Sequence, residues 1–164
     1  MPFVIILYAK WHIIGACTMN YDFLQHMYKL PPRVVNKIHN DNELIDVIRN
    51  KFTANNAKNF ITFTELSLRY WSTILPISIR TLQRDLENKH KILEFKVIEI
   101  FVEVGEIYSI GLQAFDDNKE RLNTWLITEN AYFNNKRPID IMYSHKGRDM
   151  IKAELNRIEY SEFS

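Results

Sequence analysis

Hydrophobic residues recur every three or four positions through residues 93–115, a spacing that places them on one side of an α-helix. The positions are Leu93, Val97, Ile100, Phe101, Val104, Ile107, Tyr108, Leu112 and Phe115. Gly105 and Gly111 interrupt this pattern, and each glycine costs a helix about 1 kcal/mol relative to alanine. We therefore expect another helix to cross closely at these glycines, or the helix to bend there.

Prolines and capping residues divide the rest of the chain into shorter helices. Thr62 and Glu65 fit a capping box, and Pro76 cannot continue the helix that would follow. Ser78 is a favourable N-cap for the next helix, and Pro138 suits the first turn of a later one. The pattern predicts helices over residues 41–52, 62–75, 79–88, 93–115, 119–126, 139–143 and 146–159, a polar loop or a further helical turn over 53–59, and a short tail over 160–164.

Composition agrees with an all-α fold. The 164 residues are 46% hydrophobic and 25% charged, with four glycines and five prolines, too few turn-forming residues for an all-β sandwich. The apolar stretch over residues 3–17 is interrupted by Lys10 and His12 and falls short of about 20 apolar residues, so it does not predict a membrane span. A weak signal peptide stays open, but we favour a core element or an upstream extension and assign residues 1–40 no role.

The chain lacks the patterns of catalytic and metal chemistry. Cys17 is the single cysteine, which excludes an internal disulfide and a thiolate metal site. The five histidines are scattered, without the spacing of a metal-binding helix, and four separated glycines cannot supply a phosphate-binding loop. We therefore expect no metal, no cofactor and no enzymatic activity.

Residues 65–89 combine a helix, a tight break and a short capped helix. Ile77, Leu82 and Leu86 would hold the second helix against the first, leaving a polar face outward. The side chains of this face are Ser78, Arg80, Thr81, Gln83, Arg84, Asn88 and Lys89. Arginine can pair with guanine and glutamine or asparagine with adenine, while hydroxyls and lysine contact phosphates. The pattern predicts a DNA-binding helix-turn-helix, and an ordinary helical hairpin with a polar face stays open.

Charge is distributed unevenly along the chain, although the net charge is only +1. Residues 1–91 hold 12 basic and 7 acidic residues, whereas residues 92–164 hold 9 basic and 13 acidic residues. A basic first half suits a nucleic acid, and an acidic second half suits a different partner.

Two blocks of sequence carry a family resemblance. The first is Ile74-Leu-Pro-Ile-Ser-Ile-Arg-Thr-Leu-Gln-Arg84, and the second is Ala114-Phe-Asp-Asp…Trp125-Leu…Asn130…Arg137-Pro-Ile-Asp140…Gly147…Leu155-Asn-Arg-Ile-Glu-Tyr160. In order and spacing they resemble the helix-turn-helix and the toxin-binding domain of the Xre/MbcA/ParS-type antitoxins, the partners of RES-domain toxins. The resemblance covers about three-quarters of the chain, from about Glu43 onward. Similar proteins have a glycine-rich turn where this chain has Phe133-Asn-Asn135, so we expect a different surface loop there.

The resemblance leaves out residues 1–40, which form an N-terminal extension of unknown role. It implies a helix-turn-helix DNA-binding region (41–92) and a helical toxin-binding domain (93–164) with a long linking helix (93–115). It implies a cytoplasmic, homodimeric antitoxin of a type II toxin–antitoxin system that binds operator DNA and represses its own operon. The C-terminal tail would block the NAD pocket of a RES-type, NAD-consuming toxin. The toxin-binding residues would be Arg157, Glu159, Tyr160, Ser161, Glu162, Phe163 and Ser164.

A stand-alone helix-turn-helix transcription regulator with a dimerising C-terminal domain fits the same sequence. A RES-type gene beside this one, and a stable complex with its product, would favour the antitoxin over this alternative.

Overall fold

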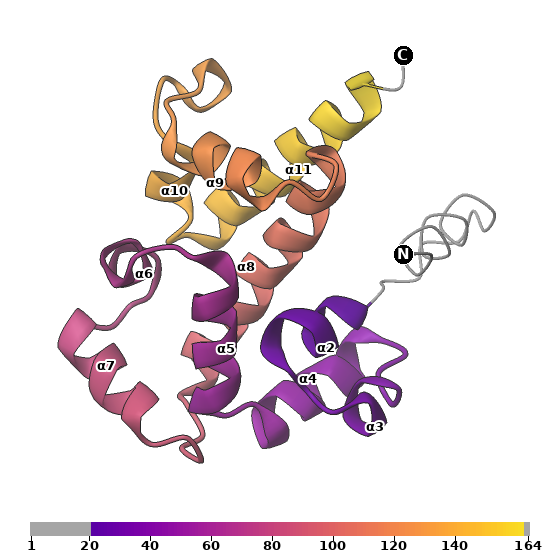
Figure 1. The fold of residues 1–164 in the computed structure, drawn as a ribbon, viewed down its shortest axis with the longest axis vertical. Helices are drawn as coiled ribbons and strands as arrows, with labels where there is room; N and C mark the ends of the chain where they lie inside the picture. Colours follow the sequence, from indigo (N-terminus) through magenta and orange to yellow (C-terminus); the bar gives the residue numbers. More distant parts are fainter. Residues whose placement is uncertain (1–20, 163–164) are drawn as a thin grey trace.

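The computed structural model of the chain describes residues 21–162, and the regular elements of this part are helical (Figure 1). The α-helices are α2 (Asp22–Tyr28), α3 (Pro32–Val35), α4 (Asp41–Lys51), α5 (Ala54–Thr64), α6 (Leu68–Ile74), α7 (Ile79–Glu87), α8 (Phe95–Ala114), α9 (Lys119–Ile127), α10 (Pro138–Ile141) and α11 (His145–Glu162), and η1 (Ala131–Phe133) is a 3-10 turn. In the described residues extended segments meet only at two isolated bridges, Thr53 with Ile92 and Asn130 with Lys136. The all-α fold class predicted from the sequence is confirmed.

Helix α8 runs through the middle of the molecule and contacts both halves of the chain (Figure 1). It packs against α2, α4 and α5 from the N-terminal half, and against α9 and α11 from the C-terminal half. Trp71 of α6 stacks on Phe101 of α8 with ring centroids 4.9 Å apart, and Phe60 of α5 meets Trp71 edge-on at 5.6 Å. One hydrophobic core therefore continues from α2 to α11.

Both glycines of α8 lie where another helix approaches closely, as the sequence predicts. A β-carbon on Gly105 would lie 2.1 Å from the hydroxyl oxygen of Tyr28 in α2. A β-carbon on Gly111 would lie 2.5 Å from a methyl carbon of Leu122 in α9. Because these separations are far shorter than carbon contacts in a packed interior, only glycine lets α2 and α9 approach α8 this closely.

Residues 21–38, to which the sequence assigns no role, contribute to the core. Tyr28 is fully buried, and its hydroxyl donates a hydrogen bond of 2.5 Å to the carbonyl oxygen of Phe101 in α8. The side-chain amide of Asn56 in α5 donates to the carbonyl oxygen of Tyr28 at 3.0 Å. These bonds tie α2 to the two helices that it covers. The apolar leader predicted over residues 3–17 lies outside the described residues.

Helix α5 corrects the prediction for residues 53–59. These residues form neither a loop nor an isolated turn, because α5 begins directly after Thr53, whose amide and hydroxyl both lie 2.9 Å from Oδ1 of Asn56. The predicted capping box of Thr62 and Glu65 is wrong, since Glu65 adopts a left-handed conformation (φ 59°) and ends α5. The buried positions in the first turn of α5 are alanine and asparagine, which produce no hydrophobic period in the sequence.

Ion pairs line the contact between α8 and α11. The guanidinium of buried Arg148 contacts Glu103 at 2.5 Å and donates to the carbonyl oxygen of Met142 at 2.8 Å. Lys152 contacts Glu106 at 3.1 Å. Burial raises the pKa of the Glu106 carboxyl, and the ammonium of Lys152 offsets only part of this effect. These side chains fix the position of α11 along α8, and the C-terminal end of α11 projects away from the body (Figure 1).

Candidate functional site

Two short helices, α6 and α7, meet at the predicted break over residues 75–78. Oγ of Ser78 accepts a hydrogen bond from the amide of Thr81 at 3.1 Å, which caps α7, and lies 3.0 Å from the hydroxyl of Thr81. Leu82 is fully buried and Leu86 is 9% exposed, and α7 packs against both α5 and α6. The predicted N-cap and buried face of α7 are confirmed.

Most of the polar side chains that were predicted to contact DNA face solvent. We define the α7 surface as the exposed residues Arg80, Gln83, Arg84, Asn88 and Lys89. Ser78 is also exposed and Thr81 is half-buried, but their hydroxyls already serve the cap of α7. The seven residues predicted to contact DNA therefore lie on α7 or directly beside it, with five of them on its open surface.

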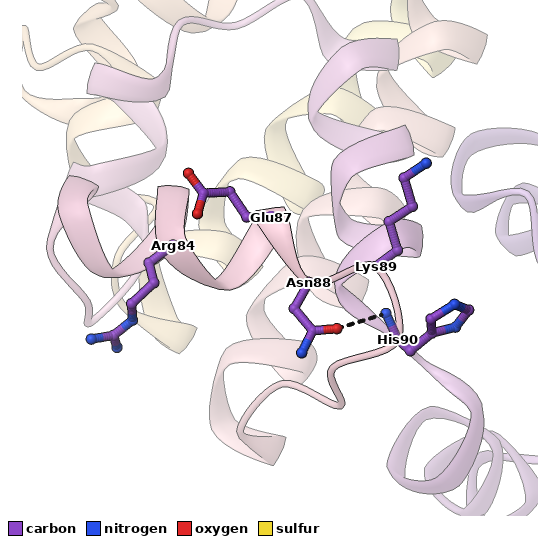
Figure 2. Close-up of a pocket in the computed structure, with 5 residues that line it drawn as sticks. All are labelled: Arg84, Glu87, Asn88, Lys89 and His90. Carbon is purple, nitrogen blue, oxygen red and sulfur yellow. Dashed lines mark hydrogen bonds between the residues drawn. The ribbon is translucent and has the colours of Figure 1, made fainter.

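The side chains at the C-terminal end of α7 spread apart rather than converge (Figure 2). A depression of about 560 Å³ is lined there by Arg84, Glu87, Asn88, Lys89 and His90. Arg84 and Glu87 point to opposite sides of the helix, while Oδ1 of Asn88 accepts from the amide of His90 at 3.3 Å. Diverging side chains do not enclose a small molecule, but they suit an extended partner such as a nucleic-acid backbone.

Nearby carboxylates neutralise only some of the cations around α7. Buried Asp85 contacts Lys91 at 2.5 Å and lies 3.6 Å from Nε of Arg84. In the part of the chain that the structure describes, Arg80 and Lys89 form no ion pair. Their charges are therefore available to an anionic partner, and charge contacts of this kind dominate nucleic-acid affinity.

The segment after α8 is shaped by asparagines at its turns. Oδ1 of Asn118 accepts from a backbone amide of α9 at 3.0 Å, and Oδ1 of Asn130 accepts from a backbone amide of η1 at 2.8 Å. Asn134 and Asn135 take φ angles of 56° and 58°, a left-handed conformation that asparagine tolerates better than most residues. The two asparagines thus form the tight turn that ends the 3-10 turn η1.

Residues around α10 fix the start of the last two helices. Arg137 donates to both carboxylate oxygens of Asp140, at 2.8 and 2.7 Å, and these hydrogen bonds, together with the positive charge of Arg137, lower the pKa of Asp140. Pro138 is buried at the first position of α10, as predicted. Gly147 has no room for a β-carbon, which would lie 1.9 Å from the carbonyl oxygen of Ile141. Arg137, Pro138, Asp140 and Gly147, which belong to the second sequence block, therefore determine the local structure around α10 and the start of α11.

The end of α11 carries side chains predicted to contact a toxin. Arg157 donates two hydrogen bonds, of 2.8 and 2.7 Å, to the carboxylate of buried Glu154, yet its side chain remains 64% exposed. Glu159 is half-buried, and Tyr160 is 73% exposed. These positions offer a charged and aromatic surface to a partner.

Helix α11 extends through Glu162, so the prediction of a non-helical tail from residue 160 is wrong for its first three residues. No glycine or proline stops the helix at that point. Ser161 and Glu162 lie in the last turn of α11, whereas Phe163 and Ser164 lie outside the described residues. Arg157 therefore lies more than one turn before the end of α11. At that distance from the end, a cation stabilises the helix dipole only weakly.

The C-terminal segment matches a known protein family. Residues 111–160 match the antitoxin Xre/MbcA/ParS C-terminal toxin-binding domain. The match runs from the last turn of α8 through most of α11 and confirms the resemblance of the second sequence block. It implies a toxin as a partner and supports a non-enzymatic role in a toxin–antitoxin system. No curated protein matches the chain.

Among residues 21–162, no three histidine, cysteine or acidic side chains are grouped so that they could hold a metal ion. No helix there combines the length and the hydrophobicity that are needed to cross a bilayer.

Sequence reasoning missed side chains whose surroundings depend on tertiary packing. Tyr132 and Tyr143 are 49% and 64% exposed, although nothing in the sequence distinguishes them from core aromatics. Lys119 and Asn123 in α9 reach back to the C-terminal end of α5. Their spacing of four residues, which places both on one side of α9, is the signal that could have found this pair.

Proposed function

We propose that this chain is the antitoxin of a type II toxin–antitoxin system whose toxin is a RES-type, NAD-consuming enzyme. The match of residues 111–160 to an antitoxin toxin-binding domain carries the proposal. The RES identity of the toxin is inferred from the resemblance of the chain to antitoxins that accompany such toxins. Because the toxin acts on cellular NAD, we place the complex in the cytoplasm.

The C-terminal end of α11 inhibits the toxin by occupying its NAD pocket. In support, this end projects from the body (Figure 1), and Tyr160 is exposed. A pocket for NAD must attract pyrophosphate with positive charge, so the carboxylates of Glu159 and Glu162 are suitable occupants. The rings of Tyr160 and Phe163 would fill the space that NAD rings occupy.

Co-expression with the product of the adjacent gene tests the toxin half of the proposal. The full chain should copurify with that product and preserve cellular NAD, and deletion of residues 160–164 should abolish this protection while leaving DNA binding intact. Tyr160→Ala should weaken protection, whereas Tyr143→Ala, which alters a similarly exposed tyrosine, should not. Protection by the truncated chain would overturn the blocking mechanism, and absence of any complex would overturn the antitoxin proposal.

We also propose that the α7 surface binds operator DNA and represses the chain's own operon. Divergent, exposed side chains and the unpaired charges of Arg80 and Lys89 support this role. Arg80, Gln83, Arg84 and Asn88 would contact base edges, and Lys89 would contact phosphate. One α7 helix covers a single half-site, so a homodimer would bind two half-sites about 34–36 Å apart.

Fluorescence anisotropy with the duplex upstream of this gene, and a scrambled duplex, tests the DNA half. Arg80→Ala and Arg84→Ala should each weaken specific binding by about 1–3 kcal/mol. Arg33→Ala, which removes an exposed arginine from α3, is the charge-matched control and should change little. Unchanged binding in both α7 variants would move DNA recognition elsewhere, and no binding by the wild-type chain would overturn this half.

A further inference from the structure

Side chains of α9 complete the C-terminal end of α5. The last carbonyl groups of a helix have no partner within it. The carbonyl oxygen of Phe63 accepts from Nζ of Lys119, and that of Thr64 accepts from Nδ2 of Asn123, both at 2.9 Å. We call these two contacts the α5 cap. Both donors lie within residues 111–160, the segment that matches the toxin-binding domain.

Additional contacts hold both donors in place. Nζ of Lys119 lies 2.5 Å from a carboxylate oxygen of Glu65 and 5.2 Å from the ring centroid of Phe63. Oδ1 of Asn123 accepts from the hydroxyl of Tyr108 in α8 at 2.7 Å. This bond orients the amide so that its NH2 group faces α5, and three helices therefore meet at one hydrogen-bonded chain.

The α5 cap lies at the turn that sets the direction of α6. Glu65 has a left-handed backbone (φ 59°), which is unfavourable for glutamate without support. Helix α6 begins three residues later, and α7 packs against both α5 and α6. We propose that Lys119 and Asn123 are positioning residues for the α7 surface, so that DNA binding depends on two side chains of the toxin-binding segment. This inference rests on the proposed DNA-binding function.

The expected effect follows from the fraction of molecules that keep the correct turn. Without the α5 cap, α6 and α7 sample other directions, and the apparent dissociation constant rises in inverse proportion to the binding-competent fraction. A competent fraction of about one-fifth would weaken DNA binding about fivefold, which is the low end of typical coupling between sites.

Variants of the full chain test the positioning role. Asn123→Asp keeps the acceptor for Tyr108 but places a carboxylate against the carbonyl oxygen of Thr64. Lys119→Met keeps the alkyl chain without the donor, Lys119→Arg restores a donor, and Lys146→Met changes an exposed lysine of α11 as a control.

Asn123→Asp and Lys119→Met should each speed amide hydrogen exchange in residues 65–87 and weaken binding to the upstream duplex about fivefold. Exchange in α11 and complex formation with the adjacent gene product should not change. Lys119→Arg and Lys146→Met should behave like the wild type.

The possible outcomes separate the two proposals. Wild-type exchange and wild-type DNA affinity in both variants would overturn the positioning role, as would faster exchange spread evenly through α8 and α11. If the wild-type chain binds no duplex, the DNA-binding proposal fails, and the positioning of α6 and α7 is then decided by the exchange measurement alone.

Discussion

The effect of replacing Gly105 by alanine on stability measures how closely α2 packs against α8. The new β-carbon would lie 2.1 Å from the hydroxyl oxygen of Tyr28 and 2.9 Å from a ring carbon of Phe23. Both side chains are buried, so neither can swing into solvent to make room. Overpacking of a filled core costs about 1–3 kcal/mol, and displacement of Tyr28 would cost about another 1 kcal/mol in its bond to Phe101.

The sign of the change discriminates between two arrangements. In a helix without α2 against it, Gly105→Ala would stabilise the protein by about 1 kcal/mol, because alanine has the higher helix propensity. With α2 in place, overpacking and the weakened hydrogen bond of Tyr28 outweigh this gain, so that the free energy of unfolding falls by about 2 kcal/mol. Urea unfolding followed by circular dichroism measures the free energy of unfolding directly.

A second substitution identifies the atom responsible. Tyr28→Phe removes the hydroxyl and should cost about 1 kcal/mol through the lost hydrogen bond. In that background Gly105→Ala should cost less, because the closest atom is gone, giving a coupling energy of about 1 kcal/mol in the double-mutant cycle. A Gly105→Ala protein more stable than the wild type would refute the reasoning.

Three further substitutions test other parts of the fold. Ser78→Ala should lower the unfolding free energy by about 1 kcal/mol through loss of the α7 cap, seen as a shift in the urea midpoint; no shift would mean that the cap is not formed in solution. Gly147→Ala should lower the free energy of unfolding by about 1–3 kcal/mol, because the new β-carbon would meet the backbone of Ile141. A protein with unchanged thermal stability would contradict this close approach. Burial raises the folded-state pKa of Glu106 above its ordinary value of 4.5, so its contribution to stability is greatest below that pH and is lost as the pH rises through the folded-state pKa. Glu106→Gln should therefore gain stability relative to the wild type as the pH is raised above 4.5, and urea midpoints whose difference is independent of pH would exclude this effect.

Helices with a strong hydrophobic period or a clear stop signal could be predicted from the sequence. The bounds of α8 agree with prediction within two residues at each end, and Pro76, Ser78 and Pro138 mark the expected breaks. The close approaches at Gly105 and Gly111 could also be foreseen, since a costly glycine in a helix implies a neighbour. Local chemistry determined these features, so local reasoning was sufficient.

Features that depend on partners distant in the sequence could not be predicted. The first half of α5 buries alanines and Asn56, which look like a polar loop until α2 is placed against them. Glu65 has a left-handed backbone with Lys119 as its ionic partner, 54 residues away. The candidate site residues could be named from the local sequence alone. The direction in which α7 presents them, however, depends on α5, α6 and the α5 cap.

The central position of α8 has a consequence for how the protein melts. Because α8 belongs to a core shared by α2, α5, α6, α9 and α11, neither half retains its buried surface if the other unfolds. Calorimetry should therefore record one endotherm, with equal van't Hoff and calorimetric enthalpies. Binding of a partner to either half of the chain would then raise the melting temperature of the entire molecule.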